Sequence, residues 1–107
     1  MKIKWKVAEK ETGRYASFHK RPWPSARYYD KDCDKPCASI LCEDEYRPHR
    51  VKEGKHAELK MMVAQYHPNG SWQWKTLTKR FKTLLEAKDG LLVFLAAHPE
   101  FIPEKYR

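Results

Sequence analysis

The sequence predicts an α+β fold in which an antiparallel sheet of four to five strands is backed by one C-terminal helix. Charged and apolar side chains alternate over residues 2–8, which is typical of a half-buried strand. Asn69-Gly70, between two runs of apolar and aromatic residues, is a strong hairpin signal. Apolar residues recur with helical spacing over about 84–98, so the last predicted element is a helix. One helix can cover one face of a small sheet.

The first strand separates apolar side chains from cations. One side of the strand carries Ile3, Trp5 and Val7, and the other side carries Lys2, Lys4 and Lys6. Further strands are predicted over about 14–18, 26–30, 37–42, 58–66 and 72–79, with a polar loop over 43–57. Pro22 and Pro24 lack the amide hydrogen that a ladder needs, so we expect an edge, a bulge or a loop there.

The return strand of the hairpin also has side chains that alternate between the two faces of the sheet. Trp72 and Trp74 share one side, which we expect to point inward. Lys75 then joins the lysines of the first strand on the open face. Leu77 breaks this alternation, so a bulge is predicted near Thr76.

The helix carries its own start and stop signals. Thr83 and Glu86 fit a capping box, and Pro99 ends the helix. The apolar stripe is predicted to hold Leu84, Ala87, Leu91, Leu95 and His98, widened by Leu85, Leu92 and Phe94. Gly90 in its middle costs roughly 1 kcal/mol against alanine, so packing must compensate.

The length and net charge of the chain limit the classes of function that we expect. The chain has 107 residues, enough for one domain, and 22 Lys and Arg against 14 Asp and Glu give a net charge of +8. Such a balance favours an anionic partner, nucleic acid first and an acidic protein second. No apolar run is long enough to span a membrane, and the three cysteines fit a reducing compartment, so we expect a cytoplasmic protein.

Two features predict a nucleic-acid-binding surface. One is the basic open face, and the other is the segment 17–30, where cations alternate with aromatic rings that can stack on bases. In that segment Tyr28 and Phe18 are expected to anchor the chain to the core, and Trp23 to stand out between its prolines. The candidate nucleic-acid-binding residues are Lys2, Lys4, Lys6, Lys20, Arg21, Trp23, Arg27, Lys75, Lys79 and Arg80. A solvated lysine face and a set of buried aromatic residues are the structural alternatives.

The sequence predicts neither catalysis nor a cofactor. It has no glycine-rich phosphate loop and no nucleophile or zinc-protease motif. Cys33, Cys37 and Cys42 lack the paired C-x2-C spacing of zinc sites, so no metal is expected.

The segment "SWQWKTLTKRFKTLLEAKDGLLVFL" resembles the end of the AP2-like arm-type DNA-binding domains of phage integrases. Phe81, Thr83, Glu86 and Ala87 match in spacing, over about a quarter of the chain. The resemblance implies a sheet backed by one helix, DNA in contact with the sheet, and an origin in a phage or other mobile element. The extra strands before the hairpin, the polar loop and the lack of a catalytic domain depart from that pattern.

These observations predict a small, basic, non-enzymatic module that binds DNA or RNA. The alternative is a protein-interaction or inhibitor domain whose basic face meets an acidic partner protein.

Overall fold

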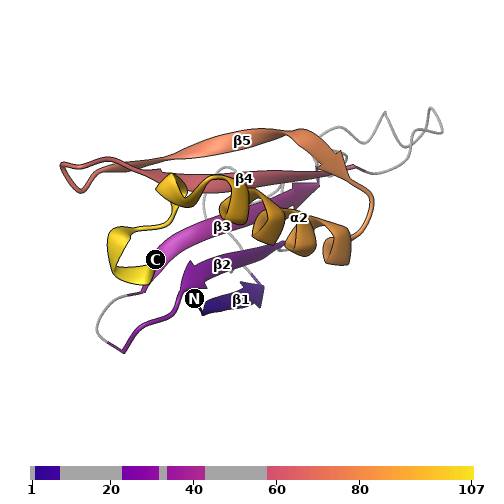
Figure 1. The fold of residues 1–107 in the computed structure, drawn as a ribbon. Coiled ribbons are helices and arrows are strands. Elements are labelled where there is room, and N and C mark those ends of the chain that lie inside the picture. The colour runs from indigo at the N-terminus through magenta and orange to yellow at the C-terminus, as the bar shows by residue number, and fades with distance from the viewer. Residues whose placement is uncertain (1, 8–22, 32–33, 43–57) are drawn as a thin grey trace, which may run out of the picture.

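The structure is a computed structural model that describes residues 2–7, 23–31, 34–42 and 58–107. Among these residues, five antiparallel strands form one sheet in the order β1-β2-β3-β4-β5, and the helix α2 lies across one face of it (Figure 1). The elements are β1 (Ile3–Val7), β2 (Pro24–Tyr28), β3 (Lys35–Cys42), β4 (Leu59–Tyr66), β5 (Trp72–Phe81), α2 (Leu84–Ala97), η3 (Pro99–Phe101) and η4 (Glu104–Tyr106). The predicted fold class is confirmed.

Most predicted elements lie within a few residues of their observed positions. β3 and β5 are longer than expected, and two short 3-10 turns follow the helix without a sequence prediction. The strand predicted at 14–18 and the loop predicted at 43–57 lie outside the described residues.

β2 begins at Pro24, which corrects the expectation of a segment outside regular pairing. Pro24 faces Val7 of β1, and β2 pairs with β3 on its other side. A proline is tolerated as the first residue of a strand, because its missing amide hydrogen falls where the ladder begins. The irregularity of β2 comes later, as a register shift between Ala26 and Arg27.

The β4–β5 hairpin closes with a three-residue loop. Gly70 donates its amide to the His67 carbonyl at 3.0 Å, and His67 donates to Ser71 at 2.9 Å. Gly70 has φ of 87°, the left-handed conformation that glycine adopts without strain. The hairpin signal of Asn69-Gly70 is therefore confirmed. The irregularity expected near Thr76 is also present, because the β4–β5 register shifts opposite residues 76–80.

The core lies between the sheet and α2. Its central strands contribute Ile40, Met61 and Val63, and the helix contributes Leu91 and Leu95, all with relative exposures of 0–1%. β2 and the first five residues of β4 bury alternate residues, as a half-covered sheet requires, whereas β5 buries only Leu77 and Phe81. Within the described residues, no helix is long and apolar enough to cross a membrane.

The N-terminus of α2 has the predicted cap. Glu86 donates its backbone amide to the Thr83 hydroxyl at 3.1 Å, and its carboxylate accepts from the Lys82 amide at 3.1 Å. The predicted width of the apolar stripe was wrong. Leu85 and Leu92 are 70% and 53% exposed, because the sheet covers only the side of the helix that carries Leu91 and Leu95.

Gly90 is explained by close packing against Phe81 of β5. A Cβ atom at Gly90 would overlap the Phe81 ring. We therefore expect Gly90→Ala to lower the free energy of unfolding, because overpacking costs about 1–3 kcal/mol and exceeds the roughly 1 kcal/mol gain in helix propensity. In a Phe81→Leu background the same substitution should be neutral or stabilising, which urea unfolding of the four proteins measures. Equal effects in both backgrounds would contradict the contact.

The C-terminal turns pack on the end of β2. The Tyr28 ring is fully buried and stacks on Tyr106 at 5.3 Å between centroids, and its hydroxyl donates to the Phe101 carbonyl at 3.5 Å. Lys105 Nζ forms an ion pair with Asp30 at 2.9 Å. Tyr28 is thus the core anchor that the sequence predicts.

Candidate nucleic-acid interface

The sheet has an outer face, opposite α2, whose residues follow from the strand register. Residues that pair across strands point to the same side, and so do alternate residues along a strand. Lys4 pairs with Arg27, and Lys6 pairs with Ser25, which continues the row to β3. The outer face comprises Lys2, Lys4, Lys6, Ser25, Arg27, Tyr29, Ser39, Leu41, Lys60, Met62, Ala64, Tyr66, Trp72, Trp74, Thr76 and Arg80.

The orientation of β5 is the reverse of the prediction. Trp74 pairs with Ala64 on the outer face, and Lys75 pairs with Val63, which is buried on the helix side. The helix meets β5 only through Leu77 and Phe81, so the odd-numbered residues of the strand face α2 and the tryptophans face away. Lys75 and Lys79 consequently lie beside the helix and not among the lysines of β1.

An aromatic cluster occupies the hairpin end of the outer face. The rings of Tyr66 and Trp72 lie 6.2 Å apart, and Trp74 meets Trp72 edge-on at 5.0 Å. Both tryptophans are 40% exposed. Tyr66 is held in place because its hydroxyl donates to the Pro36 carbonyl at 2.6 Å, and Lys35 Nζ lies 5.3 Å from its ring centre.

A second aromatic site lies on the same face at the β1–β2 edge. Tyr29 is 41% exposed, and its amide donates to the Lys2 carbonyl at 3.0 Å. The ammonium groups of Lys2 and Lys4 stand 4.9 and 5.4 Å from its ring centre. Arg27, exposed beside them, donates to the Asp34 carbonyl at 3.3 Å. One ring is thus surrounded by cations, the combination that holds a base and its phosphates.

The far end of the outer face adds two half-buried cations. Lys60 pairs with Arg80 across β4 and β5. The Arg80 guanidinium donates to the Leu77 carbonyl at 2.7 Å and to the Thr78 carbonyl at 3.5 Å, so part of its donor set is used within its own strand.

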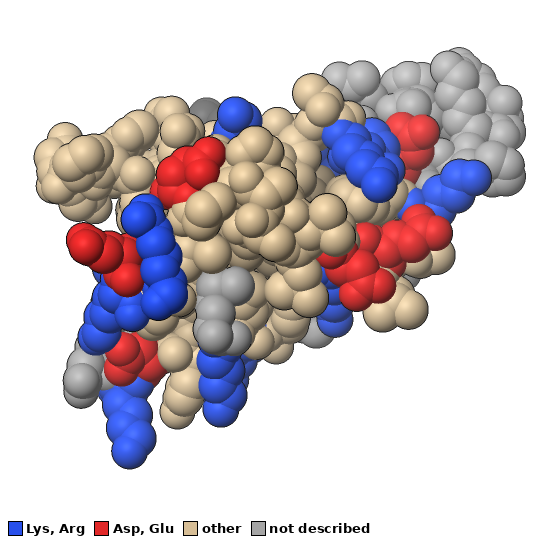
Figure 2. Space-filling model, in the orientation of Figure 1, with Lys and Arg blue, Asp and Glu red and all other residues tan. Residues whose placement is uncertain are grey.

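The outer face carries six Lys or Arg side chains and four aromatic rings, and the five strands that form it contain no Asp or Glu. Asp34 and Glu58 lie directly before β3 and β4. The opposite side differs. Figure 2, which shows the side that carries α2, has uncharged surface across its middle with acidic and basic groups around it. Among the described residues, the outer face is therefore more uniformly basic than the helix side.

The predicted site residues divide into four groups. Lys2, Lys4, Lys6, Arg27 and Arg80 lie on the outer face. Lys75 and Lys79 lie on the helix side, and Lys20 and Arg21 fall outside the described residues. Trp23 does not stand out as expected, because it is half-buried and packs against the core cluster at the start of β2.

Sequence reasoning missed five outer-face residues: Tyr29, Lys60, Tyr66, Trp72 and Trp74. The available signal was the alternation of β5, in which Leu77 and Phe81 share parity with Lys75. Taking Leu77 and Phe81 as the inward side would have placed both tryptophans outward.

The described residues offer no group of three or more His, Cys, Asp or Glu side chains that could hold a metal ion. Cys37 is a buried free thiol beside Tyr28, and burial raises its pKa to about 11. A thiol with that pKa stays protonated at neutral pH and is a poor nucleophile.

Comparisons of the chain with protein-family models, with curated proteins and with solved structures found no match. The resemblance to arm-type DNA-binding domains stays a prediction.

Proposed function

We propose that the protein is a non-enzymatic module that binds single-stranded nucleic acid, DNA or RNA, on the outer face of its sheet. The observation that carries this proposal is the composition of that face, where exposed rings lie among cations without a carboxylate on the described strands. Aromatic rings stack on unpaired bases, and lysine and arginine hold the phosphates.

The layout favours a single strand over a duplex. In a duplex the bases are already stacked on one another, so exposed rings such as Trp74 and Tyr29 could not stack on their faces. The two aromatic sites lie at opposite edges of the sheet, on β5 and next to β1. Because Tyr29 directly follows β2, three strand spacings of about 4.8 Å, roughly 14 Å, separate it laterally from β5, a span that an extended strand of several nucleotides can follow.

Salt dependence tests the contribution of the β1 lysines. Log affinity for an oligonucleotide of about ten nucleotides should fall linearly with log salt, with a slope near −0.7 per phosphate neutralised on a single strand. Replacing Lys2, Lys4 and Lys6 with glutamine should flatten that slope by about 2, and should weaken binding to every base sequence alike. Fluorescence anisotropy over a salt series measures both quantities.

The matched control replaces cations from elsewhere on the chain. Lys79 and Lys88 are cations on the helix side of the sheet, and Lys88 lies over the Trp5 ring at 5.3 Å. Their replacement with glutamine should leave the slope nearly unchanged. A wild-type affinity that does not respond to salt would refute the proposal.

A further inference from the structure

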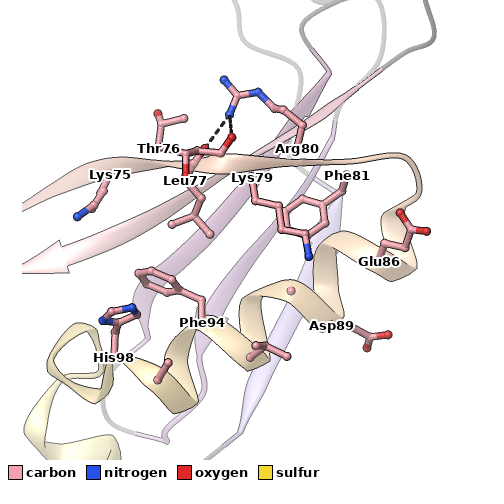
Figure 3. A pocket seen from close by; sticks show the side chains of 14 residues that line it. Lys75, Thr76, Leu77, Lys79, Arg80, Phe81, Glu86, Asp89, Phe94 and His98 are labelled. Atoms are coloured by element: carbon pink, nitrogen blue, oxygen red, sulfur yellow. Dashed lines mark hydrogen bonds between the residues drawn. The ribbon is translucent and has the colours of Figure 1, made fainter.

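β5 is an edge strand of the described sheet, paired with β4 on one side only. Between it and α2 lies a groove of about 970 Å³, which Figure 3 shows from close by. Lys75, Leu77, Lys79 and Phe81 point from the strand toward the helix, while Phe94 and His98 point back from the helix (Figure 3). This groove is on the side of the sheet opposite the outer face.

The groove combines an apolar floor with two cations. Leu77 and Phe81 are buried beneath it, and Phe94 packs edge-on against Phe101 at 5.0 Å. Lys75 Nζ lies 5.5 Å from the Phe101 ring centre, and Lys79 Nζ lies 5.5 Å from that of Phe81. Among the described residues, neither lysine forms an ion pair. Two cations held over aromatic rings beside an apolar floor are suited to receive carboxylates.

We propose that this groove binds an extended peptide that adds a strand along the free edge of β5. The peptide carries an apolar residue flanked two positions away on each side by Asp or Glu. This proposal is independent of nucleic-acid binding on the outer face.

The spacing follows from the period of a β-strand. Lys75, Leu77 and Lys79 are alternate residues on one side of β5, so a paired strand places its own alternate side chains beside them. The matching side chains of the peptide are acidic beside Lys75, apolar beside Leu77 and acidic beside Lys79. The Leu77 and Thr78 carbonyls accept from Arg80, but each carbonyl oxygen has two lone pairs, so backbone pairing of the peptide can extend over residues 75–79.

Charge decides between the possible occupants. A second copy of this chain is disfavoured at the edge of β5, because "WQWKTLTKRF" contains no Asp or Glu and would bring lysines against lysines. Nucleic acid is disfavoured because the floor between the two lysines is apolar, and would desolvate phosphates without donating a hydrogen bond to them. Glu86 and Asp89 line the groove from the helix, so the acidic side chains of the peptide are expected beside β5. An acidic and apolar peptide satisfies the two lysines and covers the apolar floor between them.

The experiment uses fluorescein-labelled peptides and the full chain, read by anisotropy. The probe is Thr-Glu-Thr-Leu-Thr-Glu-Thr, and the same residues with the two glutamates adjacent form the control peptide, Glu-Glu-Thr-Leu-Thr-Thr-Thr. We expect the probe to bind at least about tenfold more tightly than the control peptide. Equal affinity for the two peptides, or no binding of the probe, would overturn the proposal.

A charge exchange separates the groove from the general basicity of the protein. The double variant Lys75→Glu, Lys79→Glu should bind the probe at least about tenfold more weakly than wild type does. The same variant should bind a peptide in which lysines replace both glutamates of the probe. The double variant Lys2→Glu, Lys4→Glu has the same net charge, but its substitutions lie on the outer face. Its affinity for the probe should fall by less than about threefold. Thermal melting verifies that both variants are folded. Equal losses in the two variants would show long-range attraction only and would refute the groove.

Binding of an oligonucleotide to the same variants distinguishes the two proposals. The groove variant should keep most of its affinity for nucleic acid, whereas the outer-face variant should lose it. Failure of the oligonucleotide to bind wild type would refute the outer-face function and leave the peptide result as it stands.

Discussion

We expect Trp72→Ala combined with Trp74→Ala to weaken binding of single-stranded nucleic acid by about 2–6 kcal/mol, because each base stacked on an aromatic ring contributes about 1–3 kcal/mol. The two indoles are 40% exposed on the outer face and lie outside the buried core cluster. The double variant should therefore remain folded. Anisotropy with a labelled oligonucleotide measures the loss, and circular dichroism verifies the fold.

Gln73 is the matched control for the two tryptophans. It lies between them on β5, is exposed, and points to the helix side of the sheet. Gln73→Ala should change the affinity by less than about 0.5 kcal/mol. If the tryptophan variant and the Gln73 variant bind nucleic acid as well as wild type, the aromatic cluster has no part in binding.

The largest effect on stability is expected from Leu91→Ala, at about 2–5 kcal/mol of the free energy of unfolding. Leu91 is 0% exposed in the centre of the interface between α2 and the sheet, so truncation leaves a cavity. Because small domains are stable by only about 5–15 kcal/mol, this loss is a large fraction of the total. Urea unfolding at unchanged m-value measures it as a shift of the midpoint.

The control is the same leucine-to-alanine substitution at the next residue, Leu92. Leu92 is 53% exposed on a side of the helix that the sheet does not cover, so Leu92→Ala should cost less than about 1 kcal/mol. A cost for Leu92 equal to that for Leu91 would contradict the observed facing of α2.

The order and type of the elements were predictable because their signals are local. The alternation around Trp5, the Asn69-Gly70 turn and the Thr83–Glu86 cap each depend on neighbours within a few residues. Local backbone preferences of this kind are retained in the fold, so the fold class could be predicted from them.

The facing of α2 and β5 was not predictable in the same way. The helix has apolar residues on nearly all sides, because Val93 and Phe94 lie outside the arc of about 120° that its leucines span. Such a pattern does not select the buried side, and only the contact with the sheet does. On β5, large aromatic residues suggested an inward side, but α2 covers the strand at Leu77 and Phe81.

The candidate site was predicted in part for the same reason. The lysines of β1 were placed correctly, because Ile3 and Trp5 fix the inward side of that strand. The pairing of Lys4 with Arg27 and the position of Tyr29 beside both depend on strand register, which the sequence does not specify across a long connection.

Amide chemical-shift mapping during titration with a single-stranded oligonucleotide tests the central claim most directly. The account predicts that shifts concentrate at the outer face, at Lys4, Arg27, Tyr29 and Trp74, while amides of α2 such as that of Leu92 stay unchanged. Shifts confined to α2 and the groove beside Lys75, with the outer face unchanged, would contradict it.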